Sequence, residues 1–82
     1  MARKYEGPKM NLIGGNLKRI RQERGFSQIT IPRALEYYGV IICRGSISRI
    51  EDYSRTVTDI ELYAIAQVLN VNISSLIENK DN

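Results

Sequence analysis

The chain has 82 residues, 43% of them hydrophobic and 26% charged, which are ordinary values for one small globular domain. No apolar run approaches the roughly 20 residues that a membrane span requires. One cysteine and no histidine exclude an internal disulfide and a conventional zinc site. No charged-then-apolar leader precedes a small-residue cleavage site, so we expect a cytoplasmic protein. We also expect no metal, cofactor or small-molecule ligand.

Charge is distributed unevenly along the chain. Residues 1–55 contain 11 Lys and Arg against 5 Asp and Glu, whereas residues 56–82 contain 1 against 4. A basic first part and an acidic second part favour one face that binds a polyanion. The alternative is an ordinary solvated surface.

The first predicted helix follows a basic N-terminal tail. Residues 1–10 lack apolar periodicity, and we expect a flexible segment there. From Asn11 to Arg24 the apolar residues recur at helical spacing, and Gly25 stands where a left-handed residue ends a helix. Four basic side chains lie in this helix: Lys18, Arg19, Arg21 and Arg24.

The second predicted helix runs towards Tyr38 and ends at Gly39, but the sequence allows two residues as its N-cap. If Ser27 is the N-cap, Pro32 falls just beyond the first turn and removes a backbone hydrogen bond. If Thr30 is the N-cap, Pro32 lies within the first turn. We therefore expect a distorted or late-starting helix.

The third predicted helix opens at Cys43 or Arg44 and ends near Glu51 or Asp52. On a helical wheel Cys43, Ile47 and Ile50 form one narrow stripe that faces the core, so we expect Cys43 to be buried and structural, rather than reactive. The opposite side carries Gly45, at a cost of roughly 1 kcal/mol of helix propensity relative to alanine. That cost is understandable if a partner approaches closely. An amphipathic helix with surface arginines is the alternative.

The segment before this helix is predicted to pack against the domain. Val40, Ile41 and Ile42 are expected to lie beneath the second helix. Tyr37 and Tyr38 are expected to pack over the turn, with stacking on bases as the alternative.

Two further helices complete the domain. Thr58 and Glu61 form a capping box, which starts a helix that runs to Leu69, with Asn70 as a left-handed cap. Asn72 is predicted to cap a short fifth helix. Residues 79–82 are predicted to form a disordered tail. The fourth helix has two apolar stripes, one of Leu62, Ile65, Ala66 and Leu69, the other of Ile60, Ala64 and Val68. Five short helices and no useful strand pattern predict a compact all-α domain over residues 11–78.

Three motifs, in this order, resemble the lambda-repressor-like (Xre, Cro-type) helix-turn-helix family. They are GFSQ at 25–28, GSISRIE at 45–51 and LYAIAQVLNV at 62–71. The resemblance covers roughly residues 12–78 and implies a five-helix helix-turn-helix domain. The span from Ser27 to Glu51 is about five residues longer than the family pattern, so the resemblance implies an extended turn before the recognition helix. Tyr53 stands where the family often has glycine, and Pro32 where it often has alanine.

The resemblance also implies roles for individual residues. Arg44, Gly45 and Arg49 match positions that face bases in the major groove, with Ser46 and Ser48 beside them. Gln28, next to Ser27, matches a position that touches phosphate, and Arg55 a loop position that reaches the DNA backbone. Arg21 and Glu51 match a partly buried ion pair. The implied DNA-binding set is Ser27, Gln28, Arg44, Gly45, Ser46, Ser48, Arg49 and Arg55.

These observations predict a small transcriptional regulator that binds double-stranded DNA, with repression as the expected outcome. The family resemblance implies that it does so as a homodimer. We do not expect an enzyme, since there is no histidine, phosphate-binding loop or paired carboxylate on one helical face. The alternatives are a helical scaffold that contacts only proteins, and the antitoxin component of a two-protein complex.

Overall fold

The computed structural model of the chain describes residues 9–78, and these residues form helices and connecting loops without a strand. The predicted tail over residues 79–82 and the first eight residues of the predicted N-terminal tail lie outside this range. Within residues 9–78, no helix combines the length and the apolarity that crossing a membrane requires. The elements are α1 (Gly14–Glu23), α2 (Thr30–Leu35), the 3-10 helix η1 (Glu36–Tyr38), α3 (Arg44–Glu51), α4 (Asp59–Leu69) and α5 (Ile73–Ile77).

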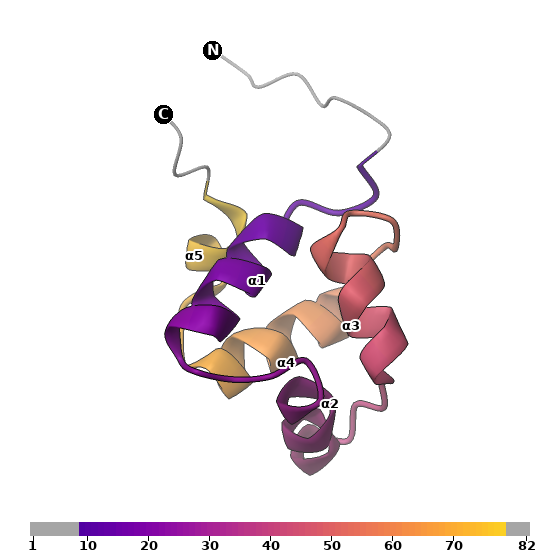
Figure 1. The fold of residues 1–82 in the computed structure, drawn as a ribbon, viewed down its shortest axis with the longest axis vertical. Helices are drawn as coiled ribbons and strands as arrows, with labels where there is room; N and C mark the ends of the chain where they lie inside the picture. Colours follow the sequence, from indigo (N-terminus) through magenta and orange to yellow (C-terminus); the bar gives the residue numbers. More distant parts are fainter. Residues whose placement is uncertain (1–8, 79–82) are drawn as a thin grey trace.

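The five α-helices pack in a closed circuit around one core. Helix α1 contacts α3, α3 contacts α2, α2 contacts α4, α4 contacts α5, and α5 returns to α1. Figure 1 shows α4 crossing behind α1, with α3 on one side, α5 on the other and α2 at the lower end. All-helical architecture is therefore confirmed. The largest fully buried side chains are Leu17, Ile31, Leu35, Ile47, Ile50, Ile65, Leu69 and Leu76.

Helix α1 is shorter than the predicted range and is tied to the end of α3. The buried Asn11 side chain lies before the helix, and its Oδ1 accepts hydrogen bonds from the N–H groups of Ile13 at 3.0 Å and Gly14 at 2.8 Å. Its Nδ2 donates to the carbonyl oxygens of Ile50 at 3.0 Å and Arg55 at 2.8 Å. One asparagine therefore fixes the start of α1 to the loop after α3.

Gly25 ends α1 in the left-handed conformation that the sequence predicted, with φ of 73°. The N–H of Phe26 donates to Arg21 O and that of Gly25 to Gln22 O, both at 3.0 Å. These two bonds form a Schellman motif, which satisfies carbonyls at the helix end and turns the chain towards α2.

Helix α2 starts late, as predicted, but neither predicted side chain caps it. It begins at Thr30, preceded by Ile29, so Pro32 is its third residue and needs no intrahelical N–H partner. The hydroxyls of Ser27 and Thr30 bond to each other at 3.1 Å. After Leu35 the chain tightens into η1 and reverses at Gly39, with φ of 74°.

The ends of α4 match the sequence prediction. Thr58 Oγ1 accepts from the N–H of Glu61 at 3.1 Å, and Glu61 Oε1 accepts from the N–H of Thr58 at 3.0 Å. Asn70 ends the helix at φ of 57°. Asn72 takes the N-cap position of α5, but its side chain makes no capping hydrogen bond, contrary to the prediction.

Tyr53 holds residues 9 and 10, which the sequence assigned to the flexible tail. Its φ is 69°, a left-handed conformation that glycine adopts more easily than other residues. The Met10 N–H donates to Tyr53 O at 2.9 Å, and Lys9 Nζ lies 4.5 Å from the ring centroid. Tyr53 Oη also accepts from the Gly15 N–H at 2.8 Å. The tail contacts the domain at least from Lys9 onward.

Gly14 allows α1 to approach the backbone of α3, and Gly14→Ala should destabilise the domain. An added Cβ would overlap the Ile50 carbonyl oxygen and lie 2.9 Å from that of Glu51. Overpacking of this kind costs typically about 1–3 kcal/mol. Chemical denaturation followed by circular dichroism measures the change. The control is Gly45→Ala, where the nearest atom is a flexible arginine terminus at 3.5 Å and stability should rise by up to ~1 kcal/mol. Equal stability of Gly14→Ala and the wild type would contradict the close approach.

Candidate functional site

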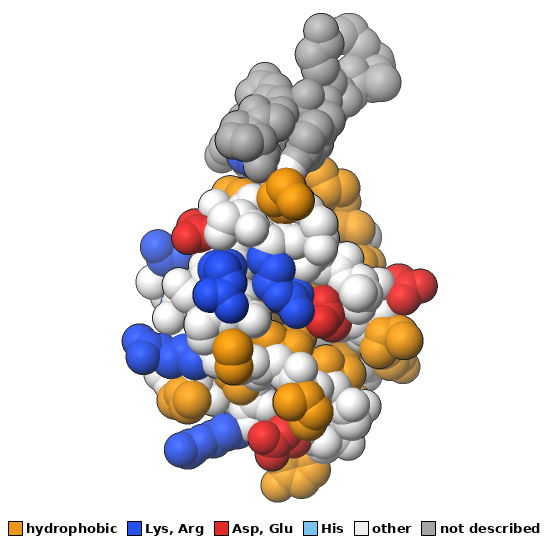
Figure 2. Space-filling view, turned by 90° about the vertical axis from the view of Figure 1, so that its right-hand side faces the viewer, with side chains coloured by type: hydrophobic (Ala, Val, Ile, Leu, Met, Phe, Trp, Pro, Cys, Tyr) orange, Lys and Arg blue, Asp and Glu red, His pale blue; other side chains and the backbone are white. Residues whose placement is uncertain are grey.

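The two sides of α3 differ as the helical wheel predicted. Ile47 and Ile50 are fully buried, whereas Arg44, Gly45 and Arg49 are exposed. Ser46 and Ser48 are half-buried and flank the exposed residues. Five of the eight residues assigned to DNA therefore lie on or beside one outward face. Figure 2 views the side of the molecule that includes α3, and basic side chains lie together at the centre of that face.

Cys43 is exposed, so the prediction of a buried structural cysteine is wrong. The helix begins one residue later, and Cys43 occupies the N-cap position with extended backbone angles, φ of −83° and ψ of 164°. The helical wheel does not apply to a residue with these angles, so its side chain leaves the apolar stripe. The Cys43 Sγ lies 3.5 Å from Ser46 Oγ.

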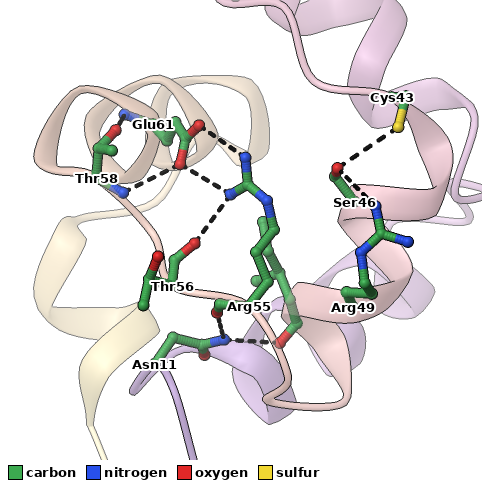
Figure 3. Close-up of polar contacts among 9 residues, drawn as sticks. Asn11, Cys43, Ser46, Arg49, Arg55, Thr56, Thr58 and Glu61 are labelled. Atoms are coloured by element: carbon green, nitrogen blue, oxygen red, sulfur yellow. Dashed lines mark hydrogen bonds and ion pairs between the residues drawn. The ribbon is translucent and has the colours of Figure 1, made fainter.

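The Arg49 guanidinium is held along the exposed face of α3. Its Nη2 donates to Ser46 Oγ at 3.2 Å, as Figure 3 shows. The hydroxyl of Ser46 lowers the pKa of the Cys43 thiol, helped by the N–H groups of Ser46 and Gly45 and by the charge of Arg49. Thiol, hydroxyl and guanidinium thus form one short polar row that sequence analysis missed.

Arg55 is bonded within the protein. Its Nη1 and Nη2 donate to the two carboxylate oxygens of Glu61 at 3.0 and 3.1 Å, and Nη1 also donates to Thr56 O at 2.9 Å. The hydrogen bond from Arg55 lowers the pKa of Glu61, so both groups are charged at neutral pH. Figure 3 shows this pair between the loop and the start of α4. The predicted contact of Arg55 with the DNA backbone stays a prediction, and the observed role is structural.

The predicted ion pair between Arg21 and Glu51 is confirmed. Arg21 Nε donates to Glu51 Oε2 at 2.6 Å and Nη2 to Oε1 at 3.1 Å, and both residues are 7% exposed. Arg21 Nη1 donates to Phe26 O at 2.8 Å. Gln28 adds a bond that the sequence did not predict, from Nε2 to Glu51 Oε1 at 2.9 Å. The network joins α1, the turn before α2, and α3.

Most arginines of α1 and of its C-terminal end also bond to other groups within the protein. Arg19 forms an exposed ion pair with Glu23 at 3.2 Å. Arg24 Nη2 donates to Leu69 O at 2.9 Å, next to the end of α4. Lys18 on α1 and Arg33 on α2 are exposed and form no ion pair within residues 9–78, as is the case for Arg44 and Arg49 on α3.

A groove brings three of the predicted DNA-binding residues together. It is open, has a volume of about 480 Å³ and lies between the turn before α2 and the start of α3. Ser27, Gln28 and Arg44 line it together with Ile29 and Arg21. The amide nitrogen of Gln28 has a second N–H besides the one donated to Glu51. Hydroxyl, amide and guanidinium donors therefore share one surface beside the exposed face of α3.

The extended turn before α3 exposes apolar side chains, contrary to prediction. Val40 and Ile42 are buried as expected, but Ile41 is 79% exposed. Tyr37 and Tyr38 are 92% and 50% exposed, so they do not pack over the turn. A single residue between two buried neighbours in an extended segment points away from the core, which explains Ile41.

A scan of the sequence against protein-family models found no match, and neither did searches of curated proteins and of solved structures. Evidence for a function therefore comes from the geometry and charge of residues 9–78.

Proposed function

We propose that the chain is a cytoplasmic transcriptional regulator that binds double-stranded DNA in a sequence-specific manner through a lambda-repressor-like helix-turn-helix. Helices α2 and α3 form the motif, α3 enters the major groove, and the expected outcome is repression. One observation carries the proposal. Arg44 and Arg49 are both exposed on the outward half of α3, and neither forms an ion pair with a residue between 9 and 78. Arginine can donate two parallel hydrogen bonds to guanine O6 and N7.

Gly45 supports the same proposal. Its backbone is helical, and an added Cβ would make only ordinary contact with the Arg49 terminus at 3.5 Å. No neighbour in residues 9–78 therefore requires a glycine at this position, although glycine weakens a helix by roughly 1 kcal/mol relative to alanine. Close approach of the DNA backbone or of a base edge to α3 accounts for it.

The groove beside α3 supplies phosphate contacts in this proposal. Ser27, Gln28 and Arg44 line it, and hydroxyl, amide and guanidinium groups are common donors to phosphate oxygens. Such contacts fix the register of a protein on the duplex, while contacts to base edges select the sequence.

A homodimer is part of the proposal. Four apolar side chains on the packed pair α4 and α5 are exposed: Ile60 (68%), Tyr63 (57%), Ile73 (36%) and Ile77 (42%). Ala64, from the second apolar stripe of α4, is buried within the chain, so only the start of that stripe remains free. A two-fold contact there would place two copies of α3 about 34–36 Å apart over a palindrome. Sedimentation that finds only monomer at high concentration, free and on DNA, would contradict a dimer.

The exposed turn favours a second candidate function. Tyr37 and Ile41 present large apolar surface with no partner in residues 9–78, and exposed apolar patches often bind proteins. In this alternative the domain is a scaffold, or an antitoxin component, that contacts another protein.

A mobility-shift assay on random duplex DNA at low salt separates the two functions. DNA binding predicts an affinity whose logarithm falls linearly with the logarithm of salt concentration, because phosphate contacts release counterions. Selection from a genomic library would then yield the operator. Absence of binding to any duplex at low salt would favour the scaffold.

A further inference from the structure

Three side chains on the exposed side of α3 form a continuous row. Residues 43, 46 and 49 are three positions apart, a spacing that places neighbours along one side of a helix. Arg49 Nη2 lies 3.2 Å from Ser46 Oγ, and Ser46 Oγ lies 3.5 Å from Cys43 Sγ (Figure 3). The row begins at the helix start and ends at a predicted base-reading arginine.

The chemistry of the three groups determines which one donates and which one accepts in each hydrogen bond of the row. A guanidinium has only donors, so Ser46 Oγ must accept from Arg49. The serine proton is then free to point to Cys43 Sγ. The lowered pKa of Cys43, attributed first to the Ser46 hydroxyl, agrees with this direction. The charge of Arg49 on α3 also lowers the pKa of the thiol, whereas the guanidinium of Arg55, in the following loop, is bonded to Glu61.

We infer that Ser46 is a positioning residue. Its hydroxyl, which is hydrogen-bonded to Cys43, orients the guanidinium of Arg49 for hydrogen bonding to a base. This inference rests on the proposed function. A long arginine side chain on a surface samples many rotamers, and ordering it opposes binding. A hydrogen bond that already restrains the guanidinium in the free protein reduces that loss. Ser46 acts through Arg49 and therefore contributes to sequence selection more than to general DNA affinity.

The first experiment tests the row in the free protein, without DNA. Cys43 is the single cysteine of the chain, so the pH dependence of its alkylation by iodoacetamide reports its pKa. Ser46→Ala should move the midpoint to higher pH. The control Ser74→Ala removes an exposed helical hydroxyl that bonds to no described residue, and should leave the midpoint unchanged. An unchanged midpoint in Ser46→Ala would overturn the inference.

The second experiment is a double-mutant cycle on DNA, read as the ratio of affinities for the selected operator and for random duplex. Arg49→Ala should lower this ratio about 5- to 150-fold, and Ser46→Ala about 2- to 12-fold. Ser46→Thr keeps a hydroxyl and should restore the ratio. In the double variant the loss should equal that of Arg49→Ala alone, because Ser46 acts through Arg49. If the two losses multiply instead, Ser46 contacts DNA independently and the inference is wrong.

The outcomes separate this inference from the proposed function. If the wild type binds no duplex, the proposed function and this inference fail together. If the wild type binds and Arg49→Ala lowers the ratio while Ser46→Ala does not, only the inference fails. Should Ser46→Ala not fold, Cys43→Ala removes the other end of the row and should lower the ratio in the same direction. An unchanged ratio there would equally contradict the row.

Discussion

Replacing Glu51 with alanine should lower the midpoint of thermal unfolding by roughly 12 °C or more. Glu51 accepts hydrogen bonds from Arg21 at 2.6 and 3.1 Å and from Gln28 at 2.9 Å, and it is 7% exposed. Its loss leaves the Arg21 guanidinium buried without a counter-charge, which costs about 3–5 kcal/mol. A domain of this size loses about 4–8 °C for each kcal/mol, so differential scanning calorimetry resolves the effect easily.

The matched control is Glu23→Ala, which breaks another Arg–Glu pair that involves α1. The pair of Arg19 and Glu23 has an N–O distance of 3.2 Å, but its side chains are 39% and 55% exposed. Exposed pairs of this kind contribute about 0–1 kcal/mol. If Glu51→Ala unfolds at the same temperature as Glu23→Ala, the buried network does not stabilise the domain as we describe.

Replacing Arg44 or Arg49 with alanine should reduce affinity for the selected operator far more than affinity for random duplex. Each arginine can discriminate by about 1–3 kcal/mol through a bidentate bond to guanine, a loss of about 5- to 150-fold in the ratio of the two affinities. Both side chains are exposed on α3, so their removal should leave the unfolding midpoint almost unchanged. Titrations of both duplexes across a salt series give the ratio and the salt dependence.

Lys18→Ala is the charge-matched control for the arginine variants. Lys18 is exposed on α1, outside the proposed reading helix, and its loss removes one positive charge. It should weaken binding to both duplexes by the same small factor and leave their ratio intact. If Arg44→Ala and Arg49→Ala behave like Lys18→Ala, α3 is not the element that reads the sequence.

Turns and helix ends were the features most completely predicted from sequence. Gly25 ends α1, Thr58 and Glu61 cap α4, and Asn70 ends it, all as the local pattern indicated. Each of these signals depends on hydrogen bonds between residues at most five positions apart, or on the φ angle of one residue. Such interactions can be read from a short stretch of sequence because no distant segment takes part in them.

The candidate site was predicted in part. The apolar stripe of α3 placed Gly45 and Arg49 on the outward side and Arg44 at its margin, and all three residues are exposed. Cys43 was misplaced, because the wheel was extended one residue beyond the start of the helix. The row from Cys43 through Ser46 to Arg49 uses a spacing of three residues, and that spacing was the signal that could have revealed it.

Local propensity and apolar periodicity were enough to predict the all-helical class, most helix ends and the outward side of α3. They could not predict which long polar side chains hydrogen-bond within the protein. Arg55 bonds to Glu61, Gln28 bonds to Glu51, and the buried Asn11 joins α1 to the loop after α3. These partners, apart from Arg55 and Glu61, are more than twenty residues apart in sequence. Their meeting depends on how the helices pack, because a buried donor or acceptor must find a partner wherever the core places one.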